Sequence, residues 1–278
     1  MLISEAQQTG QARTEHWLNG GMETLEESIN KIKSVTRAKN VILFLGDGMG
    51  PVAVTAGRIY RGQKENLENN QAPLSFEKFP WTGQSRTYSL DKHTTDSSAS
   101  ATAFLSGTKA RYMTTGVGPE VEVGDCGAAQ KFKVRSVAHW AEEAGKWVGV
   151  VTTTRITDGT PAGIYAHTPN RNWDLPQNVP AEAKLQGCKD VALQLLEDTP
   201  GKAFRVIMGG GRGRMMSTNH RDYENSTEFG ERNDSRNLIN EWLDMEGNRE
   251  FVYTKQQLQE SDIETMDYFM GTDYWRQI

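Results

Sequence analysis

The segment His93–Phe104, HTTDSSASATAF, carries six hydroxyl side chains within nine residues, from Thr94 to Thr102. Segments this rich in serine and alanine are usually loops or tightly packed helices, so composition alone does not single out a nucleophile. The order is more informative, because Asp96 fits the N-cap of a helix whose first residue would be Ser97. A helix dipole favours negative charge at that position, which helps an alkoxide and then a bound phosphate. Ser97 is therefore the candidate nucleophile.

A serine nucleophile needs a base or a metal ion to activate it. None of the five histidines pairs with another at metal-ligand spacing: His16, His93, His139, His167 and His220. Metal activation is the better explanation, and Asp47 is a candidate ligand. It follows the apolar run Val41–Leu45 in a glycine-lined turn, where a carboxylate could hold a hard cation. The alternative is an aspartate that only forms the turn.

The segment 157–173, TDGTPAGIYAHTPNRNW, adds three polar candidates. Carboxylate and hydroxyl oxygens of Asp158 and Thr160 suit magnesium. Arg171 could hold a phosphate or a carboxylate with two parallel hydrogen bonds, which lysine cannot reproduce. Each residue taken singly is more simply a solvated loop residue. Together with Ser97 they indicate phosphoryl chemistry at a metal site.

The elements that position these groups alternate between strands and helices, which predicts a parallel sheet with helices on both faces. A short apolar run such as Val41–Leu45 is typical of a strand buried on both faces, and Pro51 suits the first position of the next helix. Residues 1–38 predict an N-terminal helical arm, and about 214–236 a surface insertion. The last residues, TMDYFMGTDYWRQI, show no closing element. Further strands are expected at 147–156, 204–213 and 250–254, with helices at 135–145, 180–198 and 236–247.

Composition excludes several classes of protein. The 278 residues carry a net charge of −5 with no basic stripe, which argues against a nucleic-acid partner. We find no run of 18 apolar residues and no signal peptide in this chain. Cys126 and Cys188 are either unrelated thiols or one disulfide closing a long loop, worth about 4 kcal/mol. Together with the sequons at Asn225 and Asn233, they favour a secreted chain.

Several long motifs, in order, resemble alkaline phosphatase, especially the animal membrane-bound form. The resemblance runs from about Trp17 to the end and implies a three-layer α/β/α sandwich with a large, mostly parallel central sheet, incomplete in this chain. Residues 39–278 would be the N-terminal portion of a single catalytic domain. The motifs are NVILFLGDGMG, DSSASATAFLSG, GVVTTTRI, TPAGIYAHTPNRNW and VIMGGGRGRM, supported by AGRIYRGQK and EKFPWTGQSRTYSLDKH.

The resemblance implies phosphate monoester hydrolysis through a phosphoserine, at a site with two Zn²⁺ and one Mg²⁺. Ser97 matches the nucleophile and a metal ligand, and Asp47 the ligand that bridges one zinc and the magnesium. Thr160 matches a magnesium ligand, Asp158 a position near the magnesium, and Arg171 the phosphate clamp. Cys126 and Cys188 fall where animal members carry a disulfide.

The sequence departs from the animal pattern at three positions. Asp158 stands where many animal members have His, Thr160 where they have Ser, and Thr94 where an aliphatic residue is usual. A carboxylate at position 158 should favour magnesium over zinc, a hypothesis that metal analysis of Asp158→His could refute. The change at Thr94 is a small change of packing.

The family's chains run on well past this one, and the missing part carries the glutamate of the magnesium site and the Asp and His ligands of both zincs. Residues 214–278 contain one histidine, His220, and no matching constellation. The chain alone is therefore expected to be inactive or nearly so.

The family further implies a homodimer at the cell surface or outside the cell, held by a C-terminal lipid (GPI) anchor that is absent here. The alternative is a non-catalytic secreted binding or interaction protein that keeps part of the fold. The segment DSSASAT argues against a sulfatase or phosphodiesterase, which usually carry Thr or a modified Cys as nucleophile.

Overall fold

The computed structural model describes residues 10–30, 37–67, 73–79 and 81–272. The chain divides into two compact units, a small one from Ser34 to Thr87 and a larger one that contains the rest. Ser97, Asp158, Thr160 and Arg171 belong to the larger unit, whereas Asp47 belongs to the small one.

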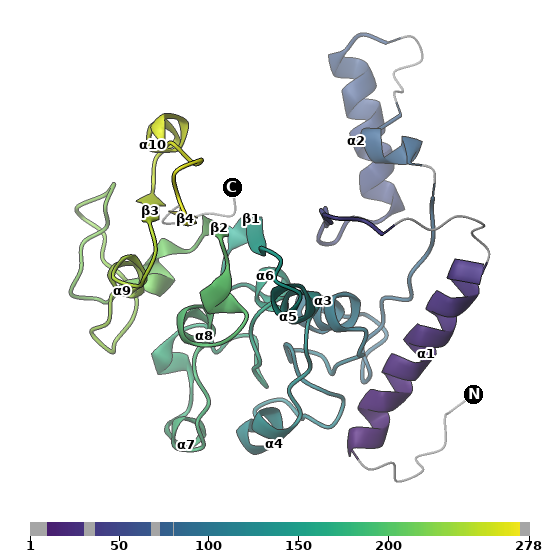
Figure 1. The fold of residues 1–278 in the computed structure, drawn as a ribbon, viewed down its shortest axis with the longest axis horizontal. Coiled ribbons are helices and arrows are strands. Elements are labelled where there is room, and N and C mark those ends of the chain that lie inside the picture. The colour runs from purple at the N-terminus through teal and green to yellow at the C-terminus, as the bar shows by residue number, and fades with distance from the viewer. Residues whose placement is uncertain (1–9, 31–36, 68–72, 80, 273–278) are drawn as a thin grey trace. The chain divides into compact units, whose positions relative to one another are not determined.

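A four-stranded parallel sheet forms the centre of the larger unit (Figure 1), with the strand order β1-β2-β4-β3. In register, Val206 of β2 lies opposite Gly149 of β1 on one side and Phe269 of β4 on the other. The parallel sheet and three of its strands confirm the sequence prediction. The strand bounds are β1 (Gly149–Arg155), β2 (Val206–Gly210), β3 (Arg249–Val252) and β4 (Tyr268–Thr272).

Short helices of the larger unit pack against this sheet and contribute to its core. Buried side chains such as Leu195 of α8 and Trp242 of α9 pack in one cluster with Ile207 and Met270 from the strands. Short 3₁₀ turns lie at Ser75–Lys78, Pro176–Asn178, Gly201–Ala203 and Arg212–Met215. The α-helices are α1 (Gly10–Asn30), α2 (Pro51–Lys64), α3 (Ser97–Ser106), α4 (Cys126–Lys131), α5 (Val137–Glu143), α6 (Gly159–Ala162), α7 (Ala181–Leu185), α8 (Val191–Glu197), α9 (Leu238–Leu243) and α10 (Lys255–Glu260).

Two predictions for the larger unit are wrong. The helix expected over 180–198 is two helices, α7 and α8, because Gly187 between them takes a left-handed φ of +89° that ends a helix. The C-terminal stretch expected to lack a closing element supplies β4, which lies in the sheet between β2 and β3. β4 is only five residues long, and the pairing with strands on both sides that stabilises it is not visible in local sequence.

The small unit contains a third departure. Helix α2 begins at Pro51 as predicted, after a turn in which Gly48 has a φ of +66°. Val41–Leu45 forms no strand, and its five apolar side chains are 46% to 89% exposed, so the expected buried strand is wrong. A parallel strand is stable only between neighbours, and no strand among the described residues pairs with this segment.

Candidate functional site

Helix α3 begins where the sequence predicts. The side chain of Asp96 accepts hydrogen bonds from the backbone N–H groups of Ser98 and Ala99, both at 3.3 Å, which satisfies two donors that the helix itself leaves unpaired. Ser97 is the first helical residue, and the helix ends at Gly107, whose φ is +75°. The Ser97 side chain therefore lies at the positive end of the helix dipole.

The hydroxyl groups of this segment differ in their surroundings. Ser98 is fully buried, whereas Ser97 is partly exposed and has no side-chain hydrogen bond with any residue that the structure describes. Three further hydroxyls donate to backbone carbonyls within the segment, those of Thr95, Ser100 and Thr102, at 3.0, 2.9 and 2.9 Å. Ser97 thus offers the helix-initial hydroxyl that solvent and a substrate can reach.

Arg171 lies against the start of α3. Its Nη1 donates to Oδ2 of Asp96 at 3.1 Å, and its Nη2 donates to Oδ1 of Asp158 at 2.6 Å. The Arg171 side chain remains 21% exposed. Burial lowers its pKa, but the hydrogen bonds and charges of the two aspartates outweigh burial and raise the pKa above its ordinary value. The guanidinium is therefore a fixed cation that still faces solvent.

Asp158 serves as the N-cap of α6. Oδ1 accepts from the backbone N–H of Gly159 at 2.7 Å, and Oδ2 accepts from the hydroxyl of Thr154 at 2.9 Å. Burial raises the pKa of Asp158. The hydrogen bonds from Gly159 and Thr154, with the nearby Arg155 and Arg171, lower it further than burial raises it, so the pKa lies below its ordinary value. Asp158 is thus held as a carboxylate.

Small residues allow α6 to approach α3 closely. A Cβ atom on Gly159 would lie 2.4 Å from Oγ of Ser98, and one on Gly163 would lie 2.5 Å from Cβ of Ala101. Real Cβ atoms do not come this near to other heavy atoms. These contacts confirm that small residues of α3 allow close packing, here against α6; that this packing supports a catalytic site stays a prediction.

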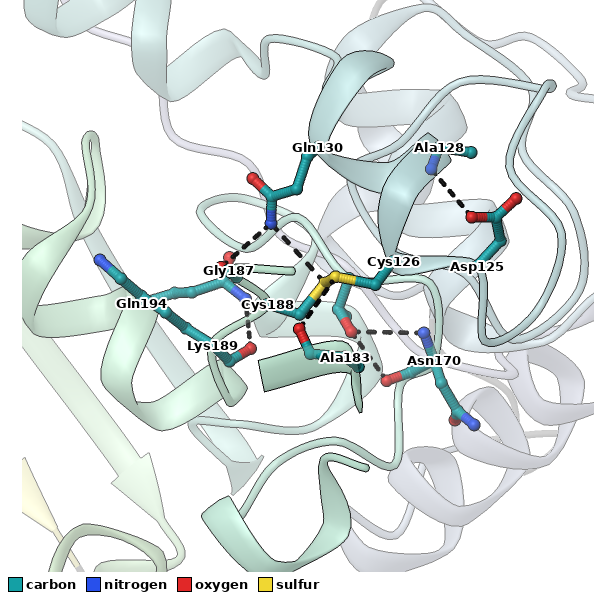
Figure 2. Close-up of a disulfide and its surroundings, with 11 residues drawn as sticks. Asp125, Cys126, Ala128, Gln130, Asn170, Ala183, Gly187, Cys188, Lys189 and Gln194 are labelled. Carbon is teal, nitrogen blue, oxygen red and sulfur yellow. Dashed lines mark hydrogen bonds between the residues drawn. A yellow bond between two sulfur atoms is a disulfide. The ribbon is translucent and has the colours of Figure 1, made fainter. Parts of the chain in front are cut away.

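A disulfide joins Cys126 and Cys188, with their Cα atoms 6.0 Å apart (Figure 2), as the family resemblance implies. The two cysteines pack with Trp173 in a small buried cluster. Trp173 follows Arg171 by two residues, and its carbonyl accepts from the backbone N–H of Val191 at 2.8 Å. This cluster anchors the loop that carries Arg171.

The structure gives the positions of the remaining predicted metal ligands, Thr160 and Asp47, without showing that they meet Ser97. Thr160 is the second residue of α6 and is partly exposed. Asp47 lies exposed in the turn before α2, in the small unit, so its meeting with Ser97 stays a prediction. The oxygen atoms of Ser97, Asp158 and Thr160 suit a hard cation. Among the described residues, however, no three or more His, Cys, Asp or Glu side chains gather as a metal site.

Two features of the larger unit escaped the sequence analysis. Asp96 was assigned only as a cap, yet it also binds Arg171 from 75 positions away. His139 and His167 do not stand at metal-ligand spacing, yet their rings lie 5.5 Å apart. The sequence offered one signal for these contacts, namely the prediction that the segments carrying each pair of residues belong to one sheet and its helices.

A family model described as alkaline phosphatase matches residues 38–272, which is most of the chain. The chain belongs to the alkaline phosphatase family. It is 38% identical to alkaline phosphatase of Gadus morhua over 261 residues, covering 92% of this chain and 54% of the relative. It is also 38% identical to the human tissue-nonspecific alkaline phosphatase over 263 residues, covering 92% of this chain and 50% of that protein. The chain thus spans about half the length of the curated alkaline phosphatases it matches.

Solved alkaline phosphatases share the fold. The Thermus thermophilus enzyme superposes with a TM-score of 0.54 at 23% identity, covering 78% of this chain and 37% of that chain. The enzyme of the Antarctic bacterium TAB5 gives a TM-score of 0.52 at 20% identity, covering 78% and 50%. These matches show an alkaline phosphatase-like α/β fold. Within the described residues, we find no helix with the length and apolar character needed to cross a bilayer.

Proposed function

We propose that Ser97 and Arg171 form the phosphate-ester site of a phosphomonoesterase that acts through a phosphoserine. The supporting observation is the partly exposed Ser97 hydroxyl at the start of α3, beside a guanidinium that Asp96 and Asp158 hold in place. The helix start favours the negative charge of a phosphate, and an arginine fork can bind two of its oxygens. Arg171 would thus orient phosphorus for attack by the Ser97 oxygen and stabilise the charge that spreads over the transferred group.

The oxygen donors of Ser97, Asp158 and Thr160 fit Mg²⁺. We propose Thr160 as a ligand with Asp158 beside the ion, and Asp47 of the small unit as a further ligand that the family resemblance implies. A cation bound there would favour the deprotonated serine and neutralise charge on the phosphate. Because the described residues include no cluster of three or more His, Cys, Asp or Glu, they do not fit a zinc site. The two Zn²⁺ of the family resemblance therefore require ligands beyond the described residues, and we assign no step to them.

For the same reason we propose that this chain by itself hydrolyses phosphate esters slowly or not at all. The test is turnover of p-nitrophenyl phosphate by the purified chain with added Zn²⁺ and Mg²⁺, beside Ser97→Ala and the neighbouring Ser98→Ala. Turnover at typical enzymatic rates that Ser97→Ala abolishes and Ser98→Ala leaves would overturn the proposed inactivity and support Ser97 as nucleophile. Turnover that survives Ser97→Ala would overturn the nucleophile.

A second candidate is a non-catalytic binding protein that keeps the phosphate site without turnover. The lack of a zinc cluster among the described residues favours it. The two candidates predict different activity when the chain is supplied with the missing metal-binding residues. Addition of the C-terminal half of a homologous enzyme, produced as a separate chain, restores turnover for a catalytic half and leaves it at zero for a binding protein.

We also propose a homodimeric, extracellular or cell-surface protein, anchored by lipid in a longer form and carrying N-glycans. Asn225 supports glycosylation, because it is exposed and its Oδ1 accepts a 2.7 Å hydrogen bond from the Thr227 hydroxyl of the same sequon. Asn233 is also exposed, but it lies between Arg232 and Asp234, whose side chains hydrogen-bond to each other. Arg232 also binds the buried Asp190. Expression in a secretory host should therefore give a glycan on Asn225 in preference to Asn233, as peptide mass spectrometry would show.

A further inference from the structure

A cavity with polar lining residues lies in the larger unit, apart from the site at Ser97. Residues of α5, of the end of α8 and of two loops line it. Its volume is about 410 Å³, within the range of small-molecule sites. None of Ser97, Asp158, Thr160 and Arg171 lines it. The family assignment leaves this cavity without a role, and its chemistry depends on two histidines.

His167 presents a fixed lone pair. Its side chain is buried, and its Nδ1 lies 2.6 Å from the carbonyl oxygen of Gly116. A carbonyl only accepts, so Nδ1 must carry the hydrogen and Nε2 must be the unprotonated nitrogen. No described residue forms a hydrogen bond with Nε2, although the backbone N–H of His167 is bonded to Gln194. His167 lines the cavity, so the cavity holds an acceptor that lacks a donor among the described residues.

The ring of His167 stays neutral at physiological pH. Burial lowers its pKa most, and the positive charge of Lys133 and the neighbouring His139 lower it further. The hydrogen bond with Gly116 and the charge of Asp198 oppose this shift, and the resulting pKa is about 4. The lone pair of Nε2 is thus available to a ligand rather than occupied by a proton.

His139 cannot supply the missing donor. Its Nδ1 accepts from the backbone N–H of Ser136 at 3.1 Å, since a backbone N–H can only donate. The Ser136 hydroxyl donates its own hydrogen to the carbonyl of Ile164 at 2.6 Å. The hydrogen of a neutral His139 ring therefore sits on Nε2, and a hydrogen bond with the Thr199 backbone raises the pKa of His139 against a larger lowering by burial. The two rings play opposite roles although they lie 5.5 Å apart.

Cations and carboxylates around the cavity are balanced, since Arg236 also pairs with Glu241. Two of the carboxylates, Glu197 and Asp198, line the cavity. Asp198 is 2.6 Å from Lys189, and Glu197 is 3.1 Å from Lys189 and 2.9 Å from Arg236. Arg135 on the opposite wall pairs with Glu143. Lys133 forms no ion pair with any residue the structure describes, and it is exposed. Among the residues that line the cavity, a ligand can thus meet the ammonium group of Lys133, the unused N–H groups of Arg135 and the lone pair of His167.

We propose that this cavity binds hydrogen phosphate, with its P–O–H donating to Nε2 of His167 and its anionic oxygens accepting from Lys133 and Arg135. An anion can pair with Lys133, and one that also carries a hydrogen can donate to the unpartnered lone pair of His167. Sulfate has the same shape and charge but carries no hydrogen at neutral pH. A lone pair of a sulfate oxygen would therefore face the lone pair of Nε2, with no hydrogen between them. A site built to accept a hydrogen from its ligand discriminates strongly against an analogue that lacks it. The inference does not rest on the proposed catalysis.

The test uses the full chain with Arg171→Ala, so that the site beside Ser97 contributes no phosphate binding. Phosphate and sulfate are titrated at pH 7.5 and constant ionic strength, and the ¹⁵N resonances of the histidine rings are followed. Phosphate should shift Nε2 of His167 with an affinity at least tenfold above that of sulfate, and the ring of His220 should not move. Equal affinity for both ions, or no shift at His167, would overturn the proposal.

Two further variants separate hydrogen-bond recognition from charge. In His167→Asn the amide N–H can still reach the Gly116 carbonyl but the Nε2 acceptor is lost, so phosphate affinity should fall to that of sulfate. In Lys133→Gln the change is exposed, so folding is retained, and both affinities should fall by a similar factor. Preference for phosphate that persists in His167→Asn would contradict the role assigned to the lone pair.

Discussion

Two arginines of the larger unit pair with aspartate in different settings. Arg232 binds Asp190 through two hydrogen bonds of 2.9 and 3.1 Å, and the two side chains are 0% and 3% exposed. Arg171 instead divides its two Nη groups between Asp96 and Asp158 and remains 21% exposed. The first arginine has its charge closed off by protein, whereas the second keeps a face toward solvent. The difference predicts that Arg232 stabilises the fold, and it agrees with the proposal that Arg171 binds a phosphate.

Arg232→Met should produce the largest effect on stability. It leaves the Asp190 carboxylate buried without its cation, which costs about 3–5 kcal/mol. Urea unfolding followed by circular dichroism measures the loss, with Arg221→Met as a matched change at an exposed arginine. Adding Asp190→Asn to Arg232→Met should recover part of the loss, because the amide oxygen can still cap α8 and no charge stays buried. A loss no larger than that of Arg221→Met would remove the contrast between the two arginines.

Substitution of Asp96 separates its two roles. Asp96→Ala removes the cap of α3 and should lower the free energy of unfolding by about 1 kcal/mol. Asp96→Asn keeps an oxygen for the backbone N–H groups of Ser98 and Ala99, so it should change stability much less while removing the charge that Arg171 binds. If both variants lose the same stability in thermal or urea unfolding, the carboxylate charge rather than the cap holds this region.

Asp158 predicts a small dependence of stability on acid pH. Its pKa in the folded protein lies below the ordinary value of 3.8, so the ionised carboxylate stabilises the fold above that pH. This contribution is lost as the pH falls through the lower, folded-state pKa. As the pH is lowered from 5, the free energy of unfolding should therefore fall less steeply in Asp158→Asn than in the parent chain. Asp262→Asn, at an exposed position, is the control, and an equal slope in all three proteins would contradict the assigned interactions of Asp158.

Local sequence was sufficient wherever a few neighbouring residues determine the structure. Asp96 as a cap, Ser97 as the first residue of α3 and Pro51 at the start of α2 follow from hydrogen bonds and backbone preferences within one turn. The strands at 149–155 and 206–210 follow from short runs rich in β-branched or apolar residues. Apolar character alone misled at Val41–Leu45, because burial of a strand depends on partners that its own residues do not encode.

Contacts between distant segments could not be predicted in this way. The sequence offers Arg171 many carboxylates, and only the folded chain selects Asp96 and Asp158. The same holds for His167, whose unpartnered Nε2 depends on a carbonyl contributed by Gly116. The break between α7 and α8 was missed although Gly187 was visible, because a glycine ends a helix only when the chain beyond it is held elsewhere, here by the Cys126–Cys188 disulfide.

The central claim is that Arg171 serves phosphate binding and not the fold, and phosphate affinity tests it directly. Isothermal titration with inorganic phosphate would compare Arg171→Lys and Arg221→Lys, both in the His167→Asn background, so that binding at the His167 cavity is weakened equally in the two proteins. Lysine keeps the charge but loses the two-pronged contact, so Arg171→Lys should weaken phosphate binding about tenfold or more while the free energy of unfolding changes by less than about 1 kcal/mol. Phosphate affinity equal in the two variants, or a loss of stability in Arg171→Lys as large as that in Arg232→Met, would contradict the account.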